Sequence, residues 1–204
     1  MRLREKTLEL NFCTQFERFV GTPIIWFGLT QMQEARAGFD ACTRLGARLF
    51  IFQFKASAYV LRSGARQFVA EHDQMQQLRN RCNADRAIFY VFPMVGTTLE
   101  LSNNPDLISN TLLLDVTDLP TTISPPTTKA GTPRKNKLHY VDVISPLARI
   151  HSDPFNVKLI NTSVFAGEML RSSIGLKGLV GDSFDRFSEI THSVLRTSKA
   201  AAVL

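Results

Sequence analysis

Cysteine is scarce in this chain of 204 residues, which carries three cysteines at separate places, Cys13, Cys42 and Cys82. An odd number of isolated cysteines argues against a disulfide framework and a zinc knuckle, and is typical of a reducing compartment. Apolar runs are also short: none approaches the roughly 18 residues that a membrane span needs. The N-terminal residues lack the apolar segment of a signal peptide. We therefore expect a cytoplasmic protein without membrane spans.

Several common catalytic and binding motifs are missing as well. The four histidines, His72, His139, His151 and His192, are scattered without the spacing of metal ligands. The glycines between residues 175 and 181 lack the lysine–serine signature of a phosphate-binding loop. Ser57, Ser63 and the three cysteines lack a plausible histidine partner in the sequence. Acyl transfer and chemistry based on a phosphate-binding loop are therefore without support.

The composition indicates a globular protein with a basic surface. Hydrophobic residues make up 44% of the chain, enough for the core of one domain, with or without an appendage. The formal net charge is +6 and the pI about 9.5. A basic chain favours a polyanionic partner, such as nucleic acid, without requiring one.

The first segment predicts a helix over residues 3–20, because its apolar residues recur at helical spacing. Glu5 and Glu9 fall on the same face as these apolar residues. An acid on the buried side of a helix is costly unless it has a partner or a metal. Two interpretations stay open for Glu5: a frayed and solvated first turn, or a functional site.

The segments up to residue 93 predict the order helix, strand, strand, strand, helix, strand. A short helix with a capping-box start at Thr30 and an end at Gly38 lies between the first two strands. The run at 49–52 is apolar in both alternating positions, which is typical of a central strand. The expected larger elements are a strand at 24–27, a hairpin of 39–45 and 48–54, a helix at 65–81 and a strand at 87–92.

The second half of the chain is less regular. We expect strands at 112–114 and 138–143, a strand or a helix start within 156–165, and an amphipathic helix over 184–195. Residues 119–137 predict a proline-rich loop with a basic end. The organisation is then a core at 1–118, this loop, and a C-terminal elaboration at 138–204 packed on the core as part of a single domain.

Three polar residues of the predicted hairpin carry the most chemistry. Asp40 opens the first strand, and Gln53 and Lys55 end the second, the glutamine thirteen residues after the acid. Gln53 and Lys55 are two residues apart, so they project from the same face of the strand. A carboxylate and an amide oxygen are ligands that a hard divalent cation accepts, and the lysine can contact a phosphate. The set indicates metal-assisted phosphodiester hydrolysis.

The segments Gly38-Phe39-Asp40-Ala41 and Phe52-Gln53-Phe54-Lys55, set in this order of elements, resemble the PD-(D/E)XK nuclease superfamily. The Gln-x-Lys form is similar to Mrr-type restriction endonucleases, and the resemblance covers about residues 3–93. Phe39 stands where the family pattern has proline. The resemblance implies an α/β fold with a restriction-endonuclease-like core of αβββαβ order, a mixed sheet and a C-terminal α+β elaboration.

The resemblance also implies roles for individual residues. Asp40 and Gln53 would be ligands of Mg²⁺, for which Mn²⁺ can substitute, and Lys55 would be the catalytic lysine. The acid that the family carries on its first helix falls on Glu5 or Glu9, and Glu34 offers a rival carboxylate. Nucleic-acid contacts beyond Lys55 are expected from the basic loop, at Arg134, Lys135 and Lys137.

We therefore expect a magnesium-dependent DNA endonuclease, as part of a restriction or anti-phage defence system. Its partners would be DNA and either a second copy of the chain or another subunit of a defence complex. Two alternatives stay open. One is an inactive protein that keeps the nuclease fold to bind nucleic acid or a partner, and the other is a structural subunit of a larger assembly.

Overall fold

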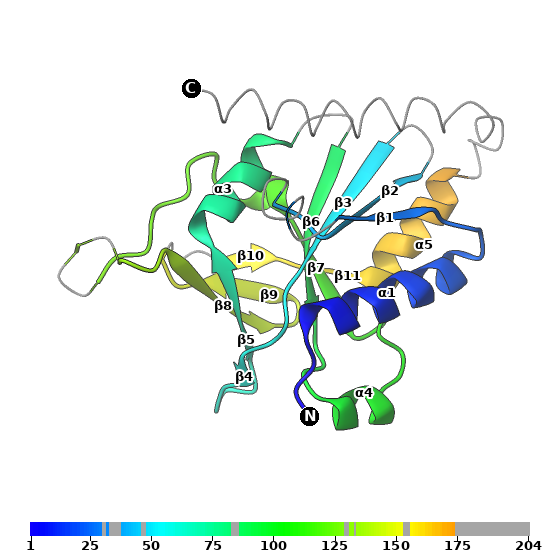
Figure 1. Ribbon diagram of the computed structural model, residues 1–204, viewed down its shortest axis with the longest axis horizontal. Helices are drawn as coiled ribbons and strands as arrows, with labels where there is room; N and C mark the ends of the chain where they lie inside the picture. Colours follow the sequence, from blue (N-terminus) through cyan, green and yellow to red (C-terminus); the bar gives the residue numbers. More distant parts are fainter. Residues whose placement is uncertain are drawn as a thin grey trace.

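The protein is a mixed α/β fold with two β-sheets and helices around them, as the computed structural model in Figure 1 shows. The structure describes residues 1–29, 32, 38–45, 48–82, 86–128, 131–132, 134–152 and 156–173. Within that part of the chain, every helix is too short or too polar to cross a membrane. Glu34 and the expected C-terminal helix lie outside the described residues.

The larger sheet has six strands and is mixed. β3 and β6 run parallel to each other, whereas all other neighbours in this sheet are antiparallel. The expected hairpin is confirmed, and its second strand, β3, lies in the interior of the sheet as its apolar sequence indicated. In spatial order the strands are β1 (Trp26–Gly28), β2 (Ala41–Leu45), β3 (Arg48–Phe54), β6 (Arg86–Pro93), β7 (Thr111–Asp115) and β11 (Ile160–Asn161).

The second sheet has five antiparallel strands, in the order β10 (Asn156–Lys158), β9 (Leu147–Ile150), β8 (Leu138–Ile144), β5 (Arg66–Glu71) and β4 (Tyr59–Val60). The α-helices of the described residues are α1 (Glu5–Val20), α3 (His72–Asn80), α4 (Thr98–Asn103) and α5 (Thr162–Ser173), and a short 3-10 helix, η1, spans Val116–Asp118.

Two apolar layers lie on opposite faces of the six-stranded sheet. On one face α1 and α5 pack against the sheet, with Phe12 of α1 against Phe52 of β3. On the other face Ile51 of β3 joins a core that includes α3 and the second sheet. Because side chains alternate along a strand, β3 supplies both layers and is apolar on both faces. The second sheet and α3 therefore lie on the side opposite α1 (Figure 1).

The helix expected over residues 65–81 is wrong in its first half. Residues 66–71 form strand β5, and α3 begins at His72. Phe68 and Met75 are both buried, seven residues apart, which is why the segment fits a helical pattern. β5 is held by antiparallel pairing with β8, in which Phe68 lies opposite Val141. A partner so distant in the sequence leaves no local signal.

The second half follows the expectations more closely. Strands β7 and β8 cover the runs expected at 112–114 and 138–143. Residues 156–165 contain both of the expected elements, because two short strands precede α5. In the described part of 119–137 the chain forms neither a helix nor an extended strand. β8 pairs with β5 and β11 pairs with β7, so residues after 137 contribute to both sheets.

Candidate functional site

The β2–β3 hairpin brings Asp40 and Gln53 into direct contact. Asp40 immediately precedes β2, and its backbone N–H donates to the carbonyl of Phe52 across the hairpin (3.2 Å). The Oδ2 atom of Asp40 accepts two hydrogen bonds, from Nε2 of Gln53 and from the backbone N–H of Phe54, both at 2.7 Å. The carboxylate is therefore fixed against the end of β3, as the spacing of the two residues in the sequence predicted.

The glycine that precedes this acid has a backbone conformation that most residues avoid. Gly38 has φ +76°, and a Cβ atom at this position would meet Oε1 of Gln77, on α3, at 2.6 Å. A left-handed conformation costs a residue with a Cβ atom roughly 1–2 kcal/mol. The glycine of the Gly-Phe-Asp segment thus allows the chain to pass α3 closely before it enters the hairpin.

We predict that Gly38→Ala lowers the free energy of unfolding by about 2 kcal/mol, because strain and a steric contact add together. Urea unfolding would measure the change. Gly64→Ala is the matched control, since Gly64 also has a positive φ (+83°) but a Cβ atom there would meet nothing within 4 Å. Equal decreases in the free energy of unfolding of the two variants would show that the steric contact with α3 adds nothing to the destabilisation at residue 38.

Gln53 and Lys55 are both buried, with exposed fractions of 1% and 8%. They alternate with Phe52 and Phe54, which face α1, and so project from the opposite face of β3. The Oε1 atom of Gln53 is buried without a hydrogen-bond partner among the described residues. Lys55 likewise forms no side-chain hydrogen bond or ion pair with a described residue, although its charge acts on Asp40. A buried acceptor is thus left without a partner here, and it is costly unless a ligand satisfies it.

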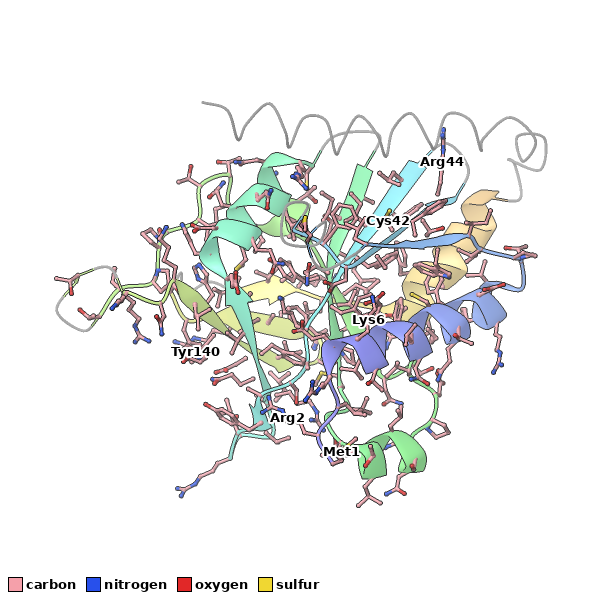
Figure 2. All side chains as sticks on the ribbon, in the orientation of Figure 1. Met1, Arg2, Lys6, Cys42, Arg44 and Tyr140 are labelled. Carbon is pink, nitrogen blue, oxygen red and sulfur yellow. The ribbon has the colours of Figure 1, made fainter. Side chains whose placement is uncertain are left out.

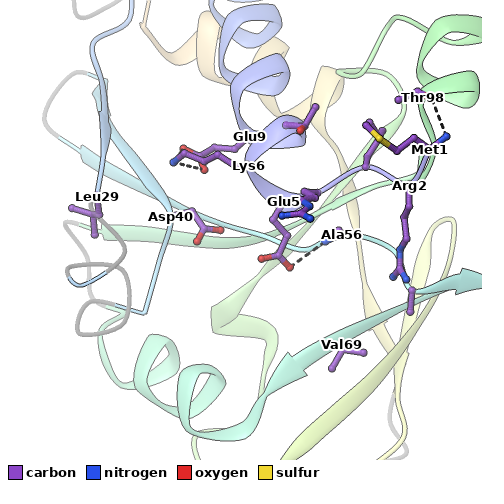
Figure 3. Close-up of a pocket in the computed structure, with 14 residues that line it drawn as sticks. Met1, Arg2, Glu5, Lys6, Glu9, Leu29, Asp40, Ala56, Val69 and Thr98 are labelled. Atoms are coloured by element: carbon purple, nitrogen blue, oxygen red, sulfur yellow. Dashed lines mark hydrogen bonds and ion pairs between the residues drawn. The ribbon is translucent and has the colours of Figure 1, made fainter.

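A cavity of about 950 Å³ lies beside this cluster, between the start of α1, the hairpin and β5. Asp40 lines the cavity together with Glu5 and Glu9 of α1, and Ala56, next to Lys55, lines it too. Figure 3 shows the three acids arriving from two elements, α1 and the start of β2. The fold therefore places both Glu5 and Glu9 near Asp40. From the sequence we expected one of these two acids at the site.

The two acids of α1 are held differently. Glu9 is 6% exposed, and both of its carboxylate oxygens accept hydrogen bonds from Nζ of Lys6, at 2.8 and 2.9 Å. Glu5 is exposed, and its Oε1 atom accepts a longer bond of 3.3 Å from the backbone N–H of Ala56. The expectation that an acid on the buried face needs a partner is confirmed for Glu9. Glu5, expected on the same face, is in contact with solvent.

The pKa of Asp40 lies well above its ordinary range, chiefly because the carboxyl group is buried. Burial raises this pKa from 3.8 to about 7, and the negative charges of Glu5 and Glu9 act in the same direction. The hydrogen bond from Phe54 and the charge of Lys55 oppose the shift without cancelling it. A carboxyl group whose charged form is disfavoured in this way gains from any cation that binds beside it.

The donor atoms at the site are oxygens, which suits a hard divalent cation such as Mg²⁺. They are the carboxylate of Asp40, the unpartnered amide oxygen of Gln53 and the carboxylates at the start of α1. The described residues contain no group of three or more His, Cys, Asp or Glu side chains arranged to hold a metal ion. The amide of Gln53 and displacement of Lys6 from Glu9 would therefore both be needed to complete a metal site.

The described residues of the basic loop do not reach this cavity. Arg134 donates to the carbonyl of Thr127 within the loop, and Lys137 forms an exposed ion pair with Asp73 at the start of α3 (3.1 Å). None of Arg134, Lys135 and Lys137 lines the cavity. In Figure 1 their segment extends beside β8 and α3, on the other side of the molecule from α1. Their proposed contact with nucleic acid would therefore be separate from the Asp40 cluster.

Sequence reasoning missed the cations that do line the cavity: Arg2, Arg4 and Lys6. Figure 2 shows Lys6 at the start of α1 and Arg2 below the helix, near Met1. Arg2 is anchored by hydrogen bonds from Nε and Nη2 to the carbonyl of Ser57 (3.2 and 2.7 Å). The three-residue spacing of Lys6 and Glu9 was a usable signal, because such pairs are neighbours on a helix.

The described histidines form hydrogen-bonded networks on the second sheet and α3. His139 is fully buried, with Nε2 3.0 Å from Nδ1 of His72 and Nδ1 2.7 Å from Oγ of Ser152. His151 pairs with Asp142 at 2.6 Å. None of these histidines lines the cavity. His139 is a core histidine whose ring nitrogens both have hydrogen-bond partners, as the sequence indicated.

Comparison of the chain with protein-family models, with curated proteins and with solved structures gives no match. The functional argument therefore rests on the chain's own residues and on the geometry of the Asp40 cluster.

Proposed function

We propose that this protein is a metal-dependent DNA endonuclease of the PD-(D/E)XK type. The observation that carries the proposal is the cluster of Asp40, Gln53 and Lys55 beside a cavity lined by acids and cations. In that cluster the buried Oε1 atom of Gln53 has no hydrogen-bond partner among the described residues, and the Lys55 ammonium group forms no hydrogen bond or ion pair with them. A bound cation and a substrate phosphate would satisfy both groups at once.

Asp40 and Gln53 would hold the metal, with Glu9 or Glu5 as the further acid. A bound Mg²⁺ or Mn²⁺ supplies charge neutralisation at the scissile phosphate and lowers the pKa of a coordinated water. Asp40 contributes a carboxylate that is already fixed by two hydrogen bonds. Because its charged form is disfavoured without a cation, the carboxylate favours the metal-bound state.

Lys55 would contact the scissile phosphate and stabilise the charge that develops on it. Lys55 is 8% exposed and its charge acts on Asp40, so water screens this charge less than that of a lysine on the surface. Its position on β3, two residues after Gln53, lets phosphate contact and metal binding occur on the same face of the sheet. Arg2 and Arg4 at the cavity wall are suited to neighbouring phosphates.

The order of elements supports the same proposal. α1 is followed by β1, β2 and β3, and after α3 the chain returns as β6 in parallel with β3. This is the αβββαβ order that the resemblance implies, with β4 and β5 inserted before α3. The net charge of +6 is compatible with a DNA substrate.

The direct test is incubation of the purified protein with plasmid and linear DNA in the presence of Mg²⁺, Mn²⁺ or EDTA. We expect cleavage with either metal, none with EDTA, and loss of cleavage in Asp40→Asn, which keeps an acceptor for the bonds from Gln53 and Phe54. Cleavage that persists in EDTA, or equally in Asp40→Asn, would contradict the assigned site.

A second candidate function is a nuclease-fold protein that binds nucleic acid or a partner without cleaving it. The lack of a preassembled group of three metal-binding acids among the described residues favours it. A scaffold of this kind would show no Mn²⁺-dependent rise in melting temperature, whereas a metal site stabilises the folded protein in proportion to its occupancy. Its DNA affinity would fall steeply with salt whether or not a metal is present.

A further inference from the structure

Lys6 occupies the place of a cation at the candidate metal site. Its Nζ atom contacts both carboxylate oxygens of Glu9, at 2.8 and 2.9 Å. The Glu9 side chain is 8% exposed, whereas that of Lys6 is 56% exposed. The acid is therefore fixed in the wall of the cavity, and the lysine reaches it from the solvent side.

Glu9 also lies near Asp40 and near the buried amide oxygen of Gln53, which has no hydrogen-bond partner among the described residues. Glu9 and Asp40 line the same cavity, and the charge of Glu9 acts on Asp40. Figure 3 shows the Lys6–Glu9 pair beside Asp40. The amide oxygen of Gln53, itself 1% exposed, has no hydrogen-bond partner among the described residues and lies on the residue that donates to Asp40. Asp40 is thus hydrogen-bonded to a residue whose amide oxygen is buried without a partner among the described residues.

We propose that Lys6 is an internal counter-ion that competes with the divalent cation for Glu9 and leaves it when the metal binds. This inference rests on the proposed metal site. A carboxylate that gives both oxygens to an ammonium group must lose at least one of these bonds before a metal can take its place. Exposure of the Lys6 side chain makes the displacement feasible, because the released ammonium group returns to water.

The pair has a second consequence for the metal-free protein. A buried carboxylate without a partner is destabilising, so Lys6 stabilises the empty site as well as opposing the cation. The lysine thereby sets the metal concentration at which the site fills. The displacement of Lys6 controls whether Glu9 can bind the metal, and it does not affect the exposed Glu5 in the same way.

The test is Mn²⁺ binding to the intact metal-free protein, measured by calorimetry and by the electron paramagnetic resonance signal of free Mn²⁺. We expect Lys6→Gln to lower the Mn²⁺ dissociation constant about fivefold. Arg4→Gln is the matched control, because it removes a cation that lines the same cavity without the contact to Glu9. It should change the constant less than twofold. Lys6→Arg keeps a charged donor and should not tighten binding.

A second readout is the melting temperature. Without metal, Lys6→Gln should melt below the wild type, and saturating Mn²⁺ should raise its melting temperature by more than it raises that of the wild type. Equal Mn²⁺ constants for Lys6→Gln and the wild type, or equal tightening in Arg4→Gln, would overturn the role of Lys6 and leave the proposed nuclease function standing. Absence of Mn²⁺ binding in all variants would instead overturn the proposed metal site itself.

Discussion

Replacement of Lys55 by methionine is expected to reduce metal-dependent DNA cleavage by about 10³-fold, the scale of losing one preorganised charge donor in an active site. Lys55 is 8% exposed and is unpaired among the described residues, so its ammonium group is not explained by a structural ion pair. Methionine fills a similar volume without the charge. The rate should therefore fall through lost phosphate contact rather than through a rearranged core.

Two measurements separate this effect from misfolding. The Mn²⁺ dissociation constant of Lys55→Met should stay within about threefold of the wild type, because the metal is held by other residues. Its free energy of unfolding should stay close to that of the wild type, because no hydrogen bond or ion pair with a described residue is lost. Lys158→Met is the matched control and should cleave at the wild-type rate, because Lys158 is exposed on β10 and does not line the cavity. Retention of full cleavage by Lys55→Met would exclude a catalytic role for the lysine.

Asp40→Asn is expected to stabilise the metal-free protein at alkaline pH while it removes metal binding. Burial is the largest cause that raises the Asp40 pKa, from 3.8 to about 7 in the folded protein. Between these values the folded protein binds more protons than the unfolded chain. The stability of the wild type should therefore fall as the pH rises from about 4 through about 7, and then level off.

The size of the effect follows from the same shift. A shift of this size corresponds to at most ~4 kcal/mol, and partial exposure of the carboxyl group to solvent reduces the expected value to about 2 kcal/mol. Asparagine does not titrate, so the advantage of Asp40→Asn over the wild type should be small near pH 4 and reach about 2 kcal/mol near pH 8.

Urea unfolding with EDTA across this pH range would measure the difference. An advantage that does not change with pH would mean that Asp40 titrates normally. With saturating Mn²⁺ in place of EDTA the order should reverse near pH 8, because only the wild type gains stability from the bound cation.

Local sequence patterns were sufficient for the elements that carry the hairpin site. The apolar spacing of α1 and the two-faced apolar run of β3 identified both elements. Asp40 and Gln53 are thirteen residues apart, and a tight hairpin makes them neighbours whatever the rest of the chain does. The contact could therefore be predicted from the sequence.

Non-local pairing explains what sequence reasoning got wrong. Residues 66–71 are a strand because β8 pairs with them, and the local pattern fits a helix equally well. The cavity also has distant origins, since α1, the hairpin and β5 each supply part of its wall. No local sequence pattern predicts how these elements pack around the cavity. The positions of Arg2 and Arg4 in the cavity wall could therefore not be predicted from the sequence.

The sequence by itself determined which residues can carry chemistry: an acid, an amide and a lysine whose spacing in a hairpin leaves them little freedom. The tertiary structure decided their environment. It removed most of Lys55 from solvent, buried the Oε1 atom of Gln53 without a partner among the described residues, placed two helix acids near Asp40, and left the basic loop on another side. Hairpin contacts depend on near neighbours in the chain, whereas burial and electrostatic surroundings depend on every element that packs nearby.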